Sequence, residues 1–493
     1  MLLTVGVSLY TVRLVLNTLG VEDFGLYNVV GGIVALLAFL PGAMGSATQR
    51  FFSYALGEGD REKLKRIFCV NWTVYALLAG FALVILETAG GWFIADYVKI
   101  APERYDAALA LYRVSVWTFI LSVLTSPFRA AITAHEDMHL YAGISILEVV
   151  LKLAAVLALA AVPGDKLVLY GWLLLGVGFV VTVVYASVCW RRYEECQFRR
   201  FYWDSTLLRE VLGFTGWTLF GQLTTVVRNQ ALTILMNQVF NPVVVAARAI
   251  ALNVATQTNL FATNFNTSLY PPIIKSYASG DRRAMYELVF SGSKITFFLM
   301  WILALPMFLQ MPLVLALWLK TPPPDAVLFT RLAFIDALIN AASLPLMTAA
   351  RAPGKMRFYE LSLGSIQLGI FLVSWFVLRA GGAPYSVFVI AIAASAIMLA
   401  LRLVIVRHLT GISVRAFVSR VLLPVIAVVA LSLVPSVVLT HLLPEGLSYA
   451  VFSAAGCFGL AACAIYFVGL DAEWRLKVKT MVVDKCGKIF AGA

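Results

Sequence analysis

Runs of about twenty apolar residues recur along most of this chain. A helix of that length spans the hydrocarbon core of a bilayer, and only a backbone that makes its hydrogen bonds internally is stable there. Charged residues make up 13% of the 493, where a soluble domain has about 25%. The sequence therefore predicts an all-α polytopic membrane protein. We expect about fourteen transmembrane helices, at residues 1–18, 25–48, 67–89, 107–130, 141–162, 167–190, 211–236, 244–268, 287–311, 326–350, 358–378, 385–406, 419–441 and 447–469.

The chain also repeats itself. Gly59-Asp60-Arg61 recurs as Gly280-Asp281-Arg282, 221 residues later, between two apolar runs each time. Glycine ends helices and aspartate caps the next one, so both copies predict a tight interhelical turn. An even number of helices per copy keeps the two copies parallel, related by an axis along the membrane normal.

Two six-helix lobes follow from this repeat, with two further helices at the C-terminal side. The predicted division is an N-terminal lobe at 1–190, a linker at 191–210, a C-terminal lobe at 211–406, two extra helices within 407–469 and a tail at 470–493. The linker contains Phe198, Phe201, Tyr202 and Trp203, so it is either an amphipathic helix on the membrane surface or an ordinary polar connection.

Lysine and arginine are concentrated in alternate connections. The even-numbered connections and the tail contain roughly five times as many as the odd-numbered ones. This bias places both termini in the cytoplasm, and we expect a multi-pass protein of the bacterial inner membrane. The net charge of +12 is then explained by loops that face anionic lipid rather than by nucleic acid.

No motif for catalysis or metal binding stands out. The six cysteines form no CxxC pair, and His135 and His139 lack a third convergent ligand. No connection is long enough for a soluble catalytic domain. We therefore expect neither an enzyme, a metal site nor a cofactor. A sodium or proton gradient is a candidate driving force, with no ion site evident in the sequence.

Polar side chains gather on two of the predicted helices. The segment 211–236 has a stripe of hydroxyls and amides at helical spacing, and 244–268 is amide-rich along its length. Such residues either hold helices together by hydrogen bonds or line a water-filled cleft, and their number favours the cleft. The amides we assign to substrate binding are Gln222, Asn229, Asn253, Gln257 and Asn264.

Three arginines complete the candidate site. Arg13, Arg228 and Arg248 lie in the first two helices of each predicted lobe. A cationic cleft favours an anionic substrate, and arginine meets phosphate oxygens bidentately. An exporter of cationic drugs would instead need carboxylates, for which Asp336, Glu148 and Glu87 are available. Lys294 and Arg402 lie near predicted helix ends, where we expect them to reach the interface.

Several segments resemble a known family. The runs SLYTVRLVLNTLGVEDFGLYNVVGG, SATQRFFSYALGEGD, VVAARAIALNVATQTNLFATNF and PPIIKSYASGD are similar to polysaccharide flippases of the Wzx type, within the MATE-like MOP superfamily. The resemblance covers roughly residues 1–420. It implies a two-lobed transporter that flips an undecaprenyl-diphosphate-linked oligosaccharide by alternating access, for lipopolysaccharide or polysaccharide biosynthesis. It also implies that Arg13 and Arg248 are candidates for contact with the diphosphate or a sugar phosphate.

Other functions remain open at this point. An ion-coupled multidrug exporter of the MATE type has the same expected fold and is the main alternative. A lipid II flippase and a membrane polymerase or ligase of the polysaccharide pathway are further alternatives, although the enzyme would need a large periplasmic loop. The expected partners are the lipid-linked oligosaccharide, membrane lipids and polysaccharide-assembly proteins.

Overall fold

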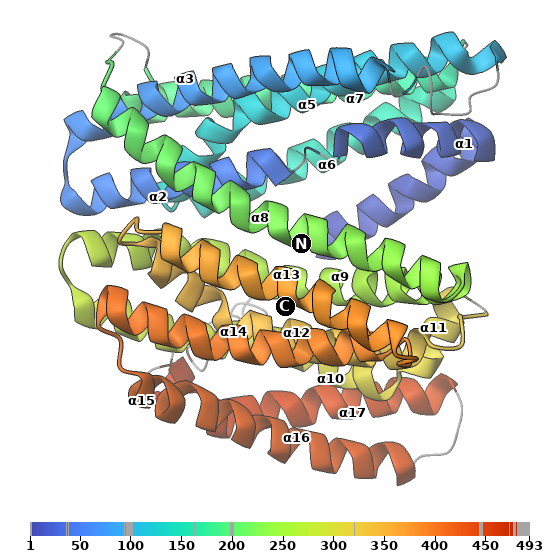
Figure 1. Ribbon diagram of the computed structural model, residues 1–493, viewed down its shortest axis with the longest axis vertical. Coiled ribbons are helices and arrows are strands. Elements are labelled where there is room, and N and C mark those ends of the chain that lie inside the picture. The colour runs from blue at the N-terminus through green and yellow to red at the C-terminus, as the bar shows by residue number, and fades with distance from the viewer. Residues whose placement is uncertain are drawn as a thin grey trace, which may run out of the picture. The chain divides into compact units, whose positions relative to one another are not determined.

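The computed structural model describes residues 2–35, 37, 39–92, 94, 102–161, 164–197, 202–319, 321–442, 447–472, 474–476 and 480. These residues form helices and no strand (Figure 1). The predicted all-α fold is therefore confirmed. The chain divides into two compact units, Met1–Leu223 and Thr224–Ala493. The residue limits of the predicted lobes, linker and tail stay a prediction.

Ten helices in the described residues are long and apolar enough to span a membrane. The pair Glu22–Val34 and Phe39–Glu58 passes the same criterion only when its two helices are taken together, and it is bent, so the expected unbroken span at 25–48 is wrong. The two segments meet at 46°. The spans expected at 211–236 and 244–268 are helical as well, but their amides and hydroxyls make them too polar for the same criterion. The ten apolar helices indicate a multi-pass membrane protein.

Unit 1 packs its helices around a core of aromatic side chains. Its elements are α1 (Leu2–Ala35), α2 (Phe39–Glu58), α3 (Arg61–Ile85), η1 (Leu86–Gly90), η2 (Pro102–Arg104), α5 (Tyr105–Ala134), α6 (Met138–Ala161), α7 (Lys166–Arg192), η3 (Glu194–Cys196) and the first part of α8 (Ser205–Val239). α5 and α7 lie side by side (Figure 1). Phe68 joins α3 to its neighbours, with its ring 6.3 Å from Phe52 and 5.9 Å from Phe128.

Unit 2 contains the rest of α8 and a larger apolar core. Its elements are α9 (Pro242–Ala278), α10 (Arg282–Leu309), α11 (Met311–Leu319), α12 (Ala326–Arg351), α13 (Arg357–Arg379), α14 (Ser386–Thr410), α15 (Val414–Phe417), η4 (Val418–Leu422), α16 (Leu423–Leu442), α17 (Leu447–Ala464) and η5 (Ile465–Gly469). α12 packs against both α9 and α14, with fully buried Phe329 and Phe334 in the core.

The repeated turn has the same local structure in both units. Gly59 and Gly280 are left-handed, with φ of 75° and 81°. The carboxylates of Asp60 and Asp281 then accept a hydrogen bond, each at 2.9 Å, from the third backbone N–H of the following helix. These are the N-caps expected from the sequence, and each satisfies one of the unpaired donors at a helix start.

A second repeated turn differs between the units. The turn between α5 and α6 has left-handed Glu136, with φ of 65°, and the turn between α12 and α13 has left-handed Gly354, with φ of 80°. The two positions are 218 residues apart. At the first turn Asp137 N donates to Ile132 O and Glu136 N to Thr133 O, which is a Schellman ending. Glutamate therefore occupies a position where glycine has no steric cost.

The last helix pair, α16 and α17, is attached to α10 by specific polar contacts. Lys294 Nζ lies 2.6 Å from Asp471 Oδ2, and Trp301 Nε1 donates to Ser432 Oγ at 2.9 Å. Lys294 is 4% exposed. The expectation that its side chain reaches the interface is therefore wrong, because the side chain is buried and its ammonium pairs with Asp471, a half-exposed acid beyond the end of η5.

The described part of the predicted linker is not an amphipathic helix. It holds the short turn η3 and an extended stretch before α8, and Trp203 is exposed. Phe198 and Phe201 lie outside the described residues. Helix α8 begins at Ser205, where the carboxylate of Asp204 accepts hydrogen bonds from Thr206 N and Leu207 N, both at 3.0 Å.

Candidate functional site

Arg248 is buried inside unit 2. It lies in α9 on the face that packs in the core, and it is 6% exposed. Its Nη1 donates to Thr233 Oγ1 of α8 at 2.7 Å. A charge buried in this way needs polar neighbours, because the loss of hydration is otherwise costly. Thr233 supplies one of them, and no carboxylate forms an ion pair with Arg248 in the described residues.

Arg228 lies in α8, close enough for its charge to act on Arg248. Its Nη2 donates to the side-chain oxygen of Asn229 at 3.0 Å. Its Nε is buried and has no hydrogen-bond partner among the described residues. The nearest compensating charge is Asp336 of α12, whose charge acts on Arg228 without a direct ion pair between them.

Asp336 is held by side chains of α12 and α14. Its Oδ1 accepts from Ser395 Oγ at 2.5 Å and from Asn340 Nδ2 at 3.3 Å. Asn340 Nδ2 also contacts Ser395 Oγ at 3.2 Å, so the three side chains form one cluster. Asp336 therefore offsets the charge of Arg228, whereas Arg248 has no carboxylate partner in the described residues.

The other predicted site residues lie in different surroundings. Asn253 and Gln257 are exposed on α9, and Asn264 is half-buried and donates to Leu260 O at 2.7 Å. Gln222 lies in the part of α8 that belongs to unit 1. Arg13 is in α1, but its side chain lies outside the described residues. The structure thus brings Arg228, Asn229 and Arg248 together and does not gather the remaining amides around them.

Part of the predicted polar stripe on α8 is packed away from water. Thr215 and Thr218 are 4% and 1% exposed within unit 1, and Thr218 Oγ1 donates to Phe214 O at 2.9 Å. These two residues are buried and do not line a water-filled cleft, and Thr218 bonds within its own helix rather than to a neighbouring one. Because the Thr218 hydroxyl donates to a carbonyl of its own helix, it needs no hydrogen-bond partner on a second helix.

Several buried charged residues were not predicted as interior groups. Arg50 was expected in a connection, but it lies in α2, 8% exposed, with its guanidinium 4.8 Å from the ring of Phe51 and 5.4 Å from that of Phe214. Arg402 donates to Ser343 Oγ of α12 rather than reaching the interface. The aromatic residues that follow Arg50 in SATQRFFSY, Phe51, Phe52 and Tyr54, were the available signal.

Two of the three alternative carboxylates, Glu148 and Glu87, lie outside this site, whereas Asp336 belongs to it. Glu148 pairs with Lys152 at 2.7 Å, as their spacing predicts, and Glu87 is exposed on η1. In the described residues, no group of three or more histidine, cysteine, aspartate or glutamate side chains is arranged to hold a metal ion.

Part of the sequence is similar to known membrane proteins. Residues 1–157 match the family model MatE. The uncharacterized membrane protein EpsK of Bacillus subtilis (strain 168) is 29% identical over 170 residues, which are 34% of this chain. That match spans 33% of the length of EpsK, so it covers only a third of this relative.

Solved structures resemble most of the chain. An outward-facing multidrug resistance MATE transporter of the MOP superfamily superposes with a TM-score of 0.69 at 15% identity, over 82% of this chain and 91% of the other. A MOP superfamily transporter from Pyrococcus furiosus, described as having a binding pocket of reverse polarity that suggests a different function, gives a TM-score of 0.61 at 15% identity, over 84% and 93%. This chain therefore has the fold of the MATE transporters of the MOP superfamily.

Proposed function

We propose that this protein is a transporter that flips an undecaprenyl-diphosphate-linked oligosaccharide across the bacterial inner membrane by alternating access, for lipopolysaccharide or polysaccharide biosynthesis. The observation that carries the proposal is the charge balance in unit 2. Arg228 and Arg248 are near each other, the charge of Asp336 acts on Arg228, and no carboxylate in the described residues forms an ion pair with Arg248. A diphosphate would supply the missing negative charge, and its oxygens match the planar donors of arginine.

The surface of α9 supports a polar substrate. Asn253, Thr256 and Gln257 are exposed on a helix that is otherwise part of the membrane unit. Amides at membrane depth are stable only against water or polar partners. A hydrated sugar chain offers hydroxyls that such side chains can bind, whereas an apolar cargo would leave them unsatisfied.

Reconstituted transport tests this proposal. Proteoliposomes would hold an undecaprenyl-diphosphate oligosaccharide with a fluorescent sugar, and an impermeant reductant would bleach only the outer leaflet. We expect the protein to make the labelled lipid of the inner leaflet accessible to the reductant. Arg228→Gln and Arg248→Gln should lower the rate of this transfer about tenfold or more, because a hydrogen bond to a charged group contributes about 1.5–3 kcal/mol. Arg379→Gln is the matched control, because Arg379 stacks on Trp375 at the end of α13.

Substitution by lysine separates charge from geometry. Arg228→Lys keeps the positive charge and loses the planar donors, so we expect intermediate transport if a diphosphate is bound bidentately. Wild-type protein that moves no labelled lipid would contradict the proposal. In cells that lack their own flippase, an Arg13→Ala and Arg248→Ala double variant that fully restores surface polysaccharide at normal protein levels would exclude these arginines as substrate contacts.

A MATE-type exporter driven by sodium or protons is the second candidate. It is favoured by Asp336, a carboxylate inside unit 2 that is held by Ser395 and Asn340. The exporter predicts that Asp336→Asn abolishes efflux of a cationic dye while Arg248→Gln does not. The flippase predicts the reverse for the lipid-linked sugar, so parallel assays of the two variants separate the candidates.

A further inference from the structure

A polar cavity of about 430 Å³ lies in unit 1 where α3 begins and α7 ends. Arg61 and Lys65 of α3 line one side, and residues of the α5–α6 turn and of the chain after α7 line the other. The cavity is well removed in sequence from the arginines of unit 2. Its charged residues are not used by the proposed transport site, so they call for a separate explanation.

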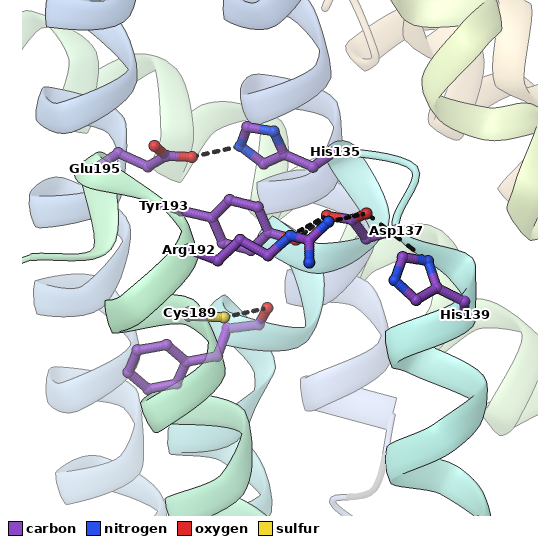
Figure 2. A network of polar contacts seen from close by, with 8 residues as sticks. His135, Asp137, His139, Cys189, Arg192, Tyr193 and Glu195 are labelled. Carbon is purple, nitrogen blue, oxygen red and sulfur yellow. Dashed lines mark hydrogen bonds and ion pairs between the residues drawn. The ribbon is translucent and has the colours of Figure 1, made fainter.

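His135 connects the α5–α6 turn to the turn η3. Its Nε2 lies 2.5 Å from Oε1 of Glu195, a residue 60 positions later that is 6% exposed (Figure 2). The imidazole also stacks on the ring of Tyr193, with centroids 4.2 Å apart and planes within 10°. The histidine is thus held between a buried carboxylate and an aromatic ring.

Asp137 fixes the same chain segment from the other side of the turn. Its Oδ2 accepts from Tyr193 Oη at 2.5 Å, and its Oδ1 accepts from Arg192 Nη2 at 3.2 Å (Figure 2). Burial, and then the hydrogen bond to Asp137, raise the pKa of Tyr193, so the phenol keeps its proton. The two residues that flank left-handed Glu136 therefore both hold the segment Arg192–Glu195.

Four of these residues form ion pairs with one another: Arg192 with Asp137, and Glu195 with His135. Arg192 is compensated by Asp137, and Glu195 is compensated by His135 only when the histidine is protonated. Histidine is the side chain whose charge changes near neutral pH. The network therefore contains two histidine pairs that depend on pH, His135–Glu195 and the longer His139–Asp137 contact, beside the pair of Arg192 with Asp137.

We infer that His135 and Glu195 form a proton-responsive latch that fastens the end of α7 and η3 to the α5–α6 turn. With His135 protonated, a charge-assisted hydrogen bond holds Glu195. With His135 neutral, the ion pair is lost and the buried carboxylate keeps only a neutral donor, which weakens the latch. Titratable or charged groups surround His135 on three sides. The end of α7 and the chain after it contribute Arg192, Tyr193, Glu194 and Glu195, and α3 contributes Arg61 and Lys65. The turn that contains His135 contributes Glu136, Asp137 and His139.

Hydrogen–deuterium exchange of the full-length protein in detergent tests the latch. The backbone amides of Tyr193, Cys196 and Gln197 are hydrogen-bonded and report on this segment. We expect their protection, normalised to the intrinsic exchange rate at each pH, to fall about fivefold between pH 5.5 and 8, since charge-assisted hydrogen bonds are about twice as strong as neutral ones. His135→Gln keeps a donor without the charge, so its protection should not change with pH.

His139→Gln is the matched control. His139 is a histidine of the same turn, but its side chain is 67% exposed and lies 3.9 Å from Asp137, outside the pair. It should keep the wild-type pH response. A pH-independent wild-type profile, or an undiminished response in His135→Gln, would overturn the inference. If His135→Gln does not fold, Glu195→Gln removes the same ion pair from the other side and should also abolish the response. The readout does not involve transport, so it is independent of the proposed substrate.

Discussion

Glu136 has the backbone conformation that the corresponding turn of unit 2 gives to Gly354. A residue with a Cβ is disfavoured there by about 1–2 kcal/mol. In return, the turn aims His135 and Asp137 at the chain that follows α7 (Figure 2). The two copies of the repeat thus use one backbone shape with different side chains.

Reciprocal substitutions at these two positions should have opposite effects on stability. We expect Glu136→Gly to raise the free energy of unfolding by about 0.5–1 kcal/mol, because glycine removes the left-handed strain but adds freedom to the unfolded chain. Gly354→Ala should lower it by about 1 kcal/mol or more. Thermal unfolding in detergent measures both, and a destabilised Glu136→Gly would show that the contacts of the glutamate side chain outweigh the strain.

At the scale of elements, two ion pairs join the C-terminal region to α10, and their side chains differ in exposure to solvent. Lys294 is 5% exposed at its side chain, whereas Asp471 is 56% exposed. The pair between Arg420 and Glu287 also joins this region to α10, but both of its side chains are about half exposed. Water screens the second pair far more than the first.

This asymmetry predicts which partner is the more costly to remove. Asp471→Asn leaves a buried ammonium without its counter-charge, and we expect a loss of about 2–3 kcal/mol of unfolding free energy. Lys294→Met removes the buried charge and leaves a solvated carboxylate, so the loss should stay below about 1 kcal/mol. Arg420→Gln is the exposed control, at about 0.5 kcal/mol. Equal losses for Asp471→Asn and Lys294→Met would contradict this account.

At the scale of the whole molecule, the repeat and the charge bias predict one sidedness for both units. The turns that contain Gly59 and Gly280 should face the cytoplasm, and the turn η2 should face the opposite side. In a chain whose native cysteines are replaced, Glu62→Cys and Arg283→Cys should react with an impermeant maleimide only in inside-out vesicles. Glu103→Cys should react in intact spheroplasts. Labelling of Glu62→Cys and Arg283→Cys from opposite sides would refute a parallel repeat.

Much of this fold could be predicted because its signals are local. The apolar spans, the caps at Asp60 and Asp281, and the Glu148–Lys152 pair depend on residues within one or two helical turns. The interior polar groups could not be paired in the same way. His135 bonds to Glu195, which is 60 residues further along the chain, and Asp336 bonds to Ser395, which is 59 residues further along. At such sequence separations the packing of the helices determines which side chains meet.

The break in the expected span at 25–48 has a similar explanation. The bend of 46° lies between Glu22–Val34 and Phe39–Glu58, inside the expected span, whereas the kink at Gly20 lies before it in α1. Residues around this region are as apolar as those of a straight helix, so hydropathy alone gives no sign of the bend. Arg50, in turn, was assigned to a connection because a charge near a helix end normally reaches water, whereas here aromatic rings surround it.

The contact between Lys294 and Asp471 also has a consequence for how the protein is made. The two residues are 177 positions apart, so at ~5–20 residues per second the ribosome needs roughly 9–35 s to supply the acid after the lysine. During that time α10 enters the membrane with an unneutralised ammonium. Biogenesis of this helix is therefore completed late, when the C-terminal pair arrives, and a stalled or truncated nascent chain leaves a charged helix for quality control to recognise.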